Sequence, residues 1–126
     1  ELVSQPRWLT DANWVESYKG KGGAILYGLM VQLAHRNQDT GSHFDNNGGD
    51  TCMKVLEGMV LVATWSLSDA IKHSMFGCPH VDWPTLAKMS TGRLFFLRVG
   101  DVLVMPAGTY HYIYTVKRKL VIAGDF

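Results

Sequence analysis

Two histidines and one aspartate have the side-chain types and the spacing to bind a metal ion. His43 and Asp45 stand two residues apart in segment 40–45 (TGSHFD), and His111 ends the distant segment 106–111 (PAGTYH). Residues two apart on an extended strand point to the same face, so one strand can present both His43 and Asp45, and a neighbouring strand must supply His111. Two imidazoles and a carboxylate on one face of a metal leave the opposite positions open, as in non-haem Fe(II) oxygenases. From this pattern alone, a chance arrangement of surface or core histidines remains the alternative.

The composition fits one domain with a substantial core. The chain has 126 residues, with 12 Lys plus Arg, 11 Asp plus Glu and a formal charge of +1. This balance indicates neither a nucleic-acid surface nor a membrane surface. No apolar run approaches the roughly 18 residues that span a bilayer, and no charged-then-apolar leader opens the chain. The basic run 117–119 (KRK) is interpreted as a solvated turn between two strands.

The two cysteines, Cys52 and Cys78, form no CxxC pair. This spacing argues against a disulfide-stapled secreted domain and favours reduced thiols in an intracellular protein. Cys78 and His80 offer two metal ligands close together, but one such pair without a second is weak evidence for zinc.

Short β-rich segments separated by turn residues predict an all-β fold. Strands are expected at 24–34, 52–56, 59–65, 94–99, 102–105, 110–116 and 120–126. A buried helix is the alternative for 24–34. The segments 52–56 and 59–65 are interpreted as a hairpin around Gly58. Short helices are expected within 1–23, 66–75 and 85–89. The pattern predicts a single domain over 1–126, an all-β jelly roll or barrel with a few short peripheral helices, its core at 24–126.

Alternation along 110–115 separates two sets of side chains. His111, Ile113 and Thr115 share one face, which suits the interior of the barrel. The tyrosines at 110, 112 and 114 share the other face, and we expect an N-terminal helix or a partner protein to cover them.

The blocks around the candidate ligands resemble the JmjC domain, particularly its lysine-demethylase branches. The resemblance rests on 27–30 (YGLM), 40–45 (TGSHFD), 48–49 (GG), 55–58 (VLEG), 100–111 (GDVLVMPAGTYH) and 124–126 (GDF). These blocks follow the family's order with comparable separations. The resemblance implies a double-stranded β-helix that binds Fe(II) through His43, Asp45 and His111. It also implies 2-oxoglutarate as cosubstrate and oxidation of a protein side chain, in the nearest relatives N-methyl-lysine of histone tails, and hence a nuclear location.

Two positions depart from the family pattern. In JmjC enzymes a lysine after the hairpin glycine pairs with the distal carboxylate of 2-oxoglutarate, and a tyrosine of the preceding strand assists it. Those positions fall on Val60 and Met53 here, whereas Thr40 matches the family's threonine that hydrogen-bonds the same carboxylate. The departure matters because a carboxylate buried without a charged or multiply hydrogen-bonded partner costs several kcal/mol.

Three outcomes are open for the missing cation. Lys54 could turn inward, although a lysine on a strand is usually solvated. Arg118 or Lys119 could reach the site, as an arginine does in other 2-oxoglutarate oxygenases. Otherwise the domain binds a metal without the cosubstrate and serves as a recognition or scaffold module. A cupin-like metal protein acting on a small molecule is a further, weaker reading.

Overall fold

The computed structural model describes residues 30–45, 49–75 and 82–125, which form one antiparallel sheet and two short helices. The strands are β1 (Met30–Ala34), β2 (Asp39–His43), β3 (Thr51–Trp65), β4 (Arg93–Arg98), β5 (Val102–Met105) and β6 (Tyr110–Asp125). The helices are α3 (Leu67–Lys72) and α4 (Trp83–Leu86). The order of the sheet is β1-β6-β3-β4, while β2 also pairs with β6 and β5 with β3. Of the strand expected at 24–34, positions 24–29 lie outside the described residues, as does the expected N-terminal helix.

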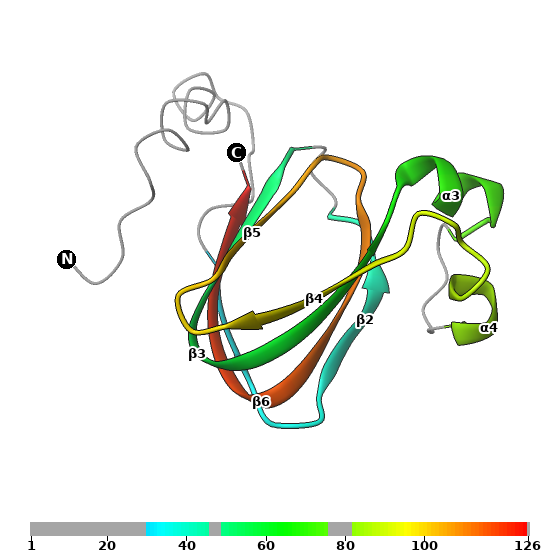
Figure 1. Ribbon diagram of the computed structural model, residues 1–126. Coiled ribbons are helices and arrows are strands. Elements are labelled where there is room, and N and C mark those ends of the chain that lie inside the picture. The colour runs from blue at the N-terminus through cyan, green and yellow to red at the C-terminus, as the bar shows by residue number, and fades with distance from the viewer. Residues whose placement is uncertain (1–29, 46–48, 76–81, 126) are drawn as a thin grey trace, which may run out of the picture.

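The sheet is folded over on itself, which creates an interior. β1 and β2 run in succession along one edge of β6, and β4 and β5 run in succession along one edge of β3. Figure 1 shows the two long central strands curving through the middle of the molecule. The core cluster joins the two halves of each long strand, since it contains Val55 and Val60 of β3 and Ile113 and Val121 of β6. Apolar residues of both halves therefore meet inside the fold, as in a jelly roll.

The predicted hairpin around Gly58 is wrong, because β3 continues through it as one strand. Gly58 has φ +85°, and the register of β3 against β6 shifts between Val55 and Val60. An extra residue in one strand bends that strand without ending it. The glycine therefore marks a bulge at the bend of the sheet.

Replacing Gly58 by alanine is expected to lower the free energy of unfolding by about 3 kcal/mol or more, from backbone strain and overpacking together. An added Cβ would overlap the carbonyl oxygen of Arg118 on the paired strand. Gly100 provides the control, because it also has a positive φ, +94°, but a Cβ there meets nothing within 4 Å. Gly100→Ala should therefore cost only about 1 kcal/mol. Urea unfolding of both variants tests this, and equal losses would contradict the steric argument.

The basic run 117–119 is also not a turn, because β6 passes straight through it. Lys117 and Arg118 are exposed, and Arg118 forms an ion pair with Glu57 on β3. Lys119 is buried on the inner face of the sheet, with 2% of its surface exposed. The expectation of a fully solvated triplet therefore fails at Lys119.

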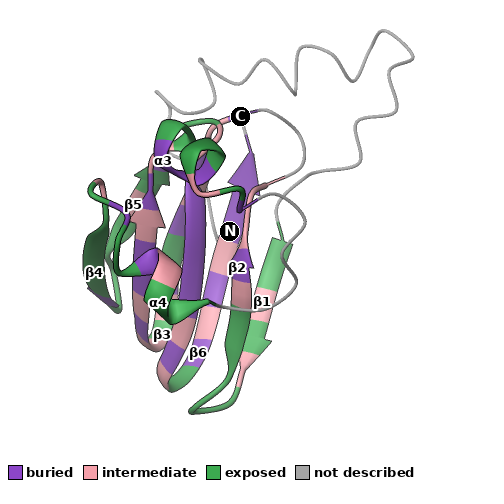
Figure 2. Ribbon diagram, turned by 90° about the vertical axis from the view of Figure 1, so that its right-hand side faces the viewer, coloured by how far each residue is buried: buried purple, intermediate pink, exposed green. Residues whose placement is uncertain are grey.

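The outer face of β6 is covered by the segment between β3 and β4. Tyr110 and Tyr112 are buried in a second cluster that this segment completes. The other buried members of this cluster are Ala63 and Trp65 of β3 and, from the segment between β3 and β4, Ala70, Met75, Leu86 and Met89. Figure 2 shows α3 and α4 against this face of the sheet. The tyrosines thus obtain their cover from within the described chain. No helix among the described residues is long and apolar enough to cross a membrane.

The predicted helix within 66–75 is confirmed, since α3 lies inside that range. The Ser66 side chain accepts a hydrogen bond from the backbone N–H of Asp69 at the start of α3. The Asp69 carboxylate in turn accepts hydrogen bonds from the backbone N–H and the hydroxyl of Thr91, both at 2.8 Å. These bonds lower the pKa of Asp69 and join α3 to the start of β4.

Candidate metal centre

The sheet register brings His43 and His111 face to face. His43 on β2 is directly opposite His111 on β6, and the centroids of the two rings are 4.3 Å apart. Asp45 follows β2, and its Oδ1 lies 3.8 Å from the Nε2 of each histidine. The three ligand atoms all lie within 4.8 Å of one another, the one such group of three among the residues with described positions. The structure therefore brings together the three residues that the sequence singled out.

Backbone carbonyls orient both imidazoles. His43 Nδ1 lies 3.3 Å from the carbonyl oxygen of Gly41, and His111 Nδ1 lies 3.1 Å from that of Thr109. Because a carbonyl oxygen only accepts, each Nδ1 carries a hydrogen, and in the neutral form of each ring the lone pair is therefore on Nε2. Burial lowers the pKa of His111, which favours the neutral, ligating form of its ring.

The donor set fits a first-row transition metal. Two imidazole nitrogens and a carboxylate oxygen suit Fe(II), Mn(II) or Zn(II). Donors bound at about 2.1 Å stand about 3 Å apart, so the 3.8 Å separations need to close by less than about 1 Å. The side chain of His43 is 41% exposed and that of His111 is 2% exposed. The common point of the three ligands is therefore at the rim of the interior, within reach of solvent.

Thr51 holds the carboxylate of Asp45 in place. Its hydroxyl donates to Asp45 Oδ2 at 2.6 Å and lies 3.0 Å from Oδ1 of Asp125, at the end of β6. Thr51 and Asp125 are both buried. This contact fixes the carboxylate with its other oxygen, Oδ1, toward the two histidines. Thr51 could not be singled out from the sequence, since a threonine at the start of a strand carries no signal of its own.

Replacing Thr51 by valine is expected to weaken Mn(II) binding by about 10- to 100-fold, the usual cost of losing a partner that orients a metal ligand. Valine keeps the shape of the side chain and removes only the hydroxyl. Thr51→Ser keeps the hydroxyl and should bind nearly as wild type does. Titration calorimetry with Mn(II) measures both, and wild-type affinity in the valine variant would contradict the role of Thr51.

A cavity of about 170 Å³ opens beside the three ligands. Its apolar wall includes Met53, Met105 and Ile113, and its polar wall includes Gln32 and Thr40. A small molecule in this space would reach the common point of the ligands from inside the sheet. Thr40, which the resemblance assigns to the cosubstrate, lines this cavity and is exposed at the edge of the sheet.

Comparison with known proteins identifies the fold. No known protein family matches the sequence, and no curated protein matches it either. Among solved structures, a protein of unknown function from Streptococcus pyogenes has 18% identity and a TM-score of 0.51 over 79% of this chain and 63% of its own. A cupin superfamily protein from Desulfitobacterium hafniense has 13% identity and a TM-score of 0.53 over 82% of this chain and 70% of its own. The Drosophila melanogaster CENP-C cupin domain has 15% identity and a TM-score of 0.53 over 83% of this chain and 63% of its own. The fold is a cupin jelly roll.

The cupin fold confirms the predicted architecture, an all-β jelly roll with few short helices. The chain spans 63% of the length of the streptococcal protein and 58% of another matching structure, Drosophila melanogaster CENP-C bound to CAL1. In that second comparison the identity is 15% and the TM-score is 0.54.

Within the cupin fold, the positions that depart from the JmjC pattern are apolar and internal. Val60 is 0% exposed and Met53 is 1% exposed, and both belong to the core cluster. Lys54 is exposed between the buried Met53 and Val55, because alternate residues of β3 point to opposite faces. The structure therefore does not bring Lys54 to the cavity, and no cation arrives from this part of β3.

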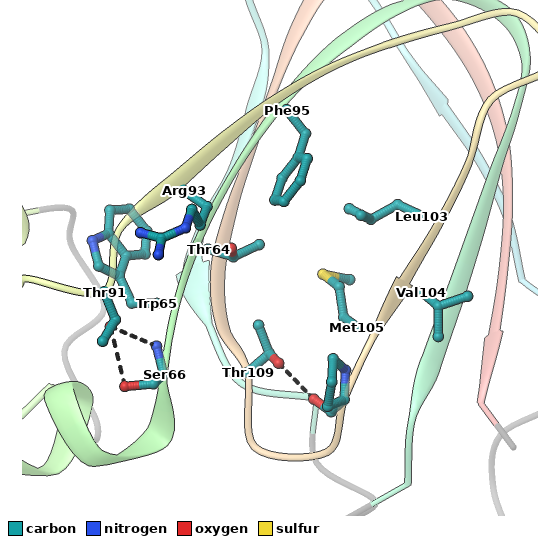
Figure 3. Close-up of a pocket in the computed structure, with 11 residues that line it drawn as sticks. Thr64, Trp65, Ser66, Thr91, Arg93, Phe95, Leu103, Val104, Met105 and Thr109 are labelled. Carbon is teal, nitrogen blue, oxygen red and sulfur yellow. Dashed lines mark hydrogen bonds between the residues drawn. The ribbon is translucent and has the colours of Figure 1, made fainter.

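A second hollow of the cupin fold, of about 240 Å³, adjoins the cavity across Met105, which lines both. Figure 3 shows Phe95 of β4 and Leu103 and Met105 of β5 around this space. Thr64, which also lines it, is directly opposite His111 in the register of β3 and β6. The hollow therefore lies beside the metal centre and is open to the outside.

Proposed function

We propose that this cupin domain is a JmjC-type oxygenase that depends on Fe(II) and 2-oxoglutarate and oxidises a protein side chain. The observation that carries the proposal is the convergence of His43, Asp45 and His111, with both Nε2 atoms freed by backbone contacts at Nδ1. The resemblance of the surrounding segments to JmjC domains supports the choice of cosubstrate.

The residues of the chain have separate tasks in this proposal. When bound, Fe(II) would supply oxidation of a substrate C–H bond by O₂, coupled to decarboxylation of the 2-oxo acid. His43, Asp45 and His111 hold one face of the site, and Thr51 keeps the Asp45 carboxylate from turning away. The apolar wall formed by Met53, Met105 and Ile113 excludes water from the inner side.

The hollow beyond Met105 is the proposed entrance for the substrate side chain. Phe95 and Leu103 provide apolar surface for an extended aliphatic chain, and Thr64 and Thr109 provide hydroxyl groups. These features support a side chain such as N-methyl-lysine, the substrate in the histone demethylases that the sequence resembles. A protein that acts on histone tails would work in the nucleus, and that location is part of the proposal.

A binding module without catalysis is the second candidate. It is favoured by the apolar environment of Val60 and Met53, where JmjC enzymes place a lysine and a tyrosine. The similarity in fold to CENP-C, whose structure was solved bound to CAL1, also supports a role in binding a protein partner.

Turnover distinguishes the two candidates. Anaerobic protein loaded with Fe(II) and 2-oxoglutarate is exposed to O₂ with trimethylated and unmethylated histone peptides, and succinate and peptide mass are measured. We expect succinate to form faster with a methylated peptide and the peptide to lose methyl groups, neither occurring with His43→Ala. Binding of Fe(II) without 2-oxoglutarate binding or succinate would overturn the oxygenase proposal and favour the binding module.

A further inference from the structure

β4 is an edge strand with one row of backbone groups left unpaired. It stands at the end of the sheet order and pairs with β3 alone among the described strands. The backbone N–H of Arg98 donates to the Asp101 carboxylate, and its C=O accepts from the Asp101 N–H, so both groups point away from β3. In an antiparallel strand, alternate residues direct their N–H and C=O to the same side. Those of Leu94 and Phe96 therefore also point away from β3, toward the free edge.

The side chains of this edge are apolar in the middle and cationic at both ends. Leu94 is 66% exposed and Phe96 is 62% exposed, and Arg93 and Arg98 are exposed as well. Figure 2 shows β4 at the margin of the sheet, coloured mostly as exposed. The Arg93 guanidinium donates to the carbonyl oxygen of Gly92, and neither arginine forms an ion pair within the described part of the chain. Free backbone groups, exposed apolar side chains and unpaired positive charge thus occur together on one strand.

The free edge of β4 borders the hollow beyond Met105. Arg93 and Phe95 line this hollow from β4, and Leu103 and Met105 line it from β5. Figure 3 shows the side chains of the two strands on either side of the space. β4 and β5 each pair with β3 but not with one another in the described sheet. An extended segment paired with β4 would run along this opening, and every second side chain of that segment would face the hollow.

We propose that β4 binds an extended segment of a partner protein as an added β-strand, with acidic residues of that segment beside Arg93 and Arg98. Backbone hydrogen bonds to Leu94 and Phe96 provide the affinity, and the exposed side chains of β4 provide the selectivity. A second copy of β4 does not match this edge, because it would bring two more arginines and no carboxylate. The pairing is independent of the metal. Only the identification of the bound segment with the oxidised substrate rests on the proposed function.

Two designed peptides test the strand pairing on the full chain without metal. The peptide DEVTVTED has alternating valine and threonine between acidic ends, and KRVTVTRK has the same centre between basic ends. Hydrogen exchange followed by NMR reports on single backbone amides. We expect saturating DEVTVTED to slow exchange at Leu94 and Phe96 by at least about 10-fold, because their N–H groups become hydrogen-bonded, and KRVTVTRK to leave it unchanged. Absence of DEVTVTED binding, or binding without slower exchange at these two amides, would overturn the proposal.

Reversing the charge of the two arginines tests the preference for acidic residues. The double variant Arg93→Glu/Arg98→Glu should bind DEVTVTED at least about 10-fold more weakly than wild type and should bind KRVTVTRK instead, because attractive contacts become repulsive. Both side chains are exposed, so the fold should persist, and circular dichroism checks this. The control Arg36→Glu/Lys54→Glu makes the same change of net charge at exposed positions outside β4 and should bind DEVTVTED as wild type does. Equal losses in the two double variants would overturn the charge match.

The outcomes separate this proposal from the proposed function. If DEVTVTED does not pair with β4, the oxygenase proposal stands, because metal binding and succinate formation are measured without the peptide. If the protein forms no succinate but protects Leu94 and Phe96 in the presence of DEVTVTED, the oxygenase proposal fails and the strand pairing stands. Slow exchange at the same two amides without peptide, lost on dilution, would identify a second copy as the occupant and overturn the proposal.

Discussion

Replacing His43 by alanine is expected to lower the affinity for Fe(II) or Mn(II) by at least about 100-fold, because losing a ligand should cost more than losing a residue that only orients one. The substitution removes one of the three donors and leaves an imidazole and a carboxylate, which bind a divalent ion weakly in water. The fold should persist, since the His43 side chain is 41% exposed and leaves no closed void. Titration calorimetry with Mn(II), together with circular dichroism, measures both effects.

His35→Ala is the matched control for His43→Ala. His35 is exposed in the turn between β1 and β2 and is not among the residues that line the cavity. Its replacement should leave metal affinity unchanged. Equal affinity in the His43 and His35 variants would show that the three converging side chains do not form a metal site.

Replacing Lys119 by methionine is expected to raise the free energy of unfolding of the ligand-free protein by about 1 to 4 kcal/mol. Methionine fills a similar volume, contacts the apolar residues of the inner face and requires no counter-charge. The wild-type lysine carries the desolvation cost of an ammonium whose one described hydrogen-bond partner is the amide of Gln32. Urea unfolding at neutral pH measures the difference. A less stable methionine variant would mean that the folded chain already stabilises the charge.

The advantage of Lys119→Met should depend on pH in one direction. Burial lowers the pKa of Lys119 in the folded protein below the value of about 10.4 in an unfolded chain. The cost of burying the charge is therefore complete below the folded pKa, declines as the pH rises from there toward about 10.4, and is absent above it. The two unfolding curves should converge in that alkaline range. Lys117→Met, which removes an exposed charge of the same strand, should change stability little at any pH.

The approach of His43, Asp45 and His111 could be predicted because it depends on local spacing and on family resemblance. Residues two apart on a strand share a face whatever the rest of the fold does, so His43 and Asp45 needed only an extended backbone. The strand at 102–105 was equally local, and β5 has those bounds. The short helix within 66–75 was predictable for the same reason, and α3 lies inside that range.

The bend of the sheet could not be predicted, because it depends on pairing between distant segments. Gly58 has the same sequence signature in a turn and in a bulge, and only the partner β6 decides between them. The run 117–119 looks solvated from its charges alone. Two of its members are exposed, but Lys119 is buried where β6 pairs with β1. The covering of Tyr110 and Tyr112 by the α3–α4 segment is likewise a tertiary contact that no local pattern indicates.

The central position of β6 has a consequence for how the protein acquires its shape. Of the described strands β6 is the last in sequence, yet β1, β2 and β3 all pair with it. During synthesis these earlier strands cannot complete their pairing until β6 has been made. Pairing between strands that are distant in sequence makes folding slow. A slip of one residue in this final pairing would turn His111 outward and Tyr110 inward. Assembly of the ligand set is thus one of the last events in maturation, and metal uptake by refolding protein would report its completion.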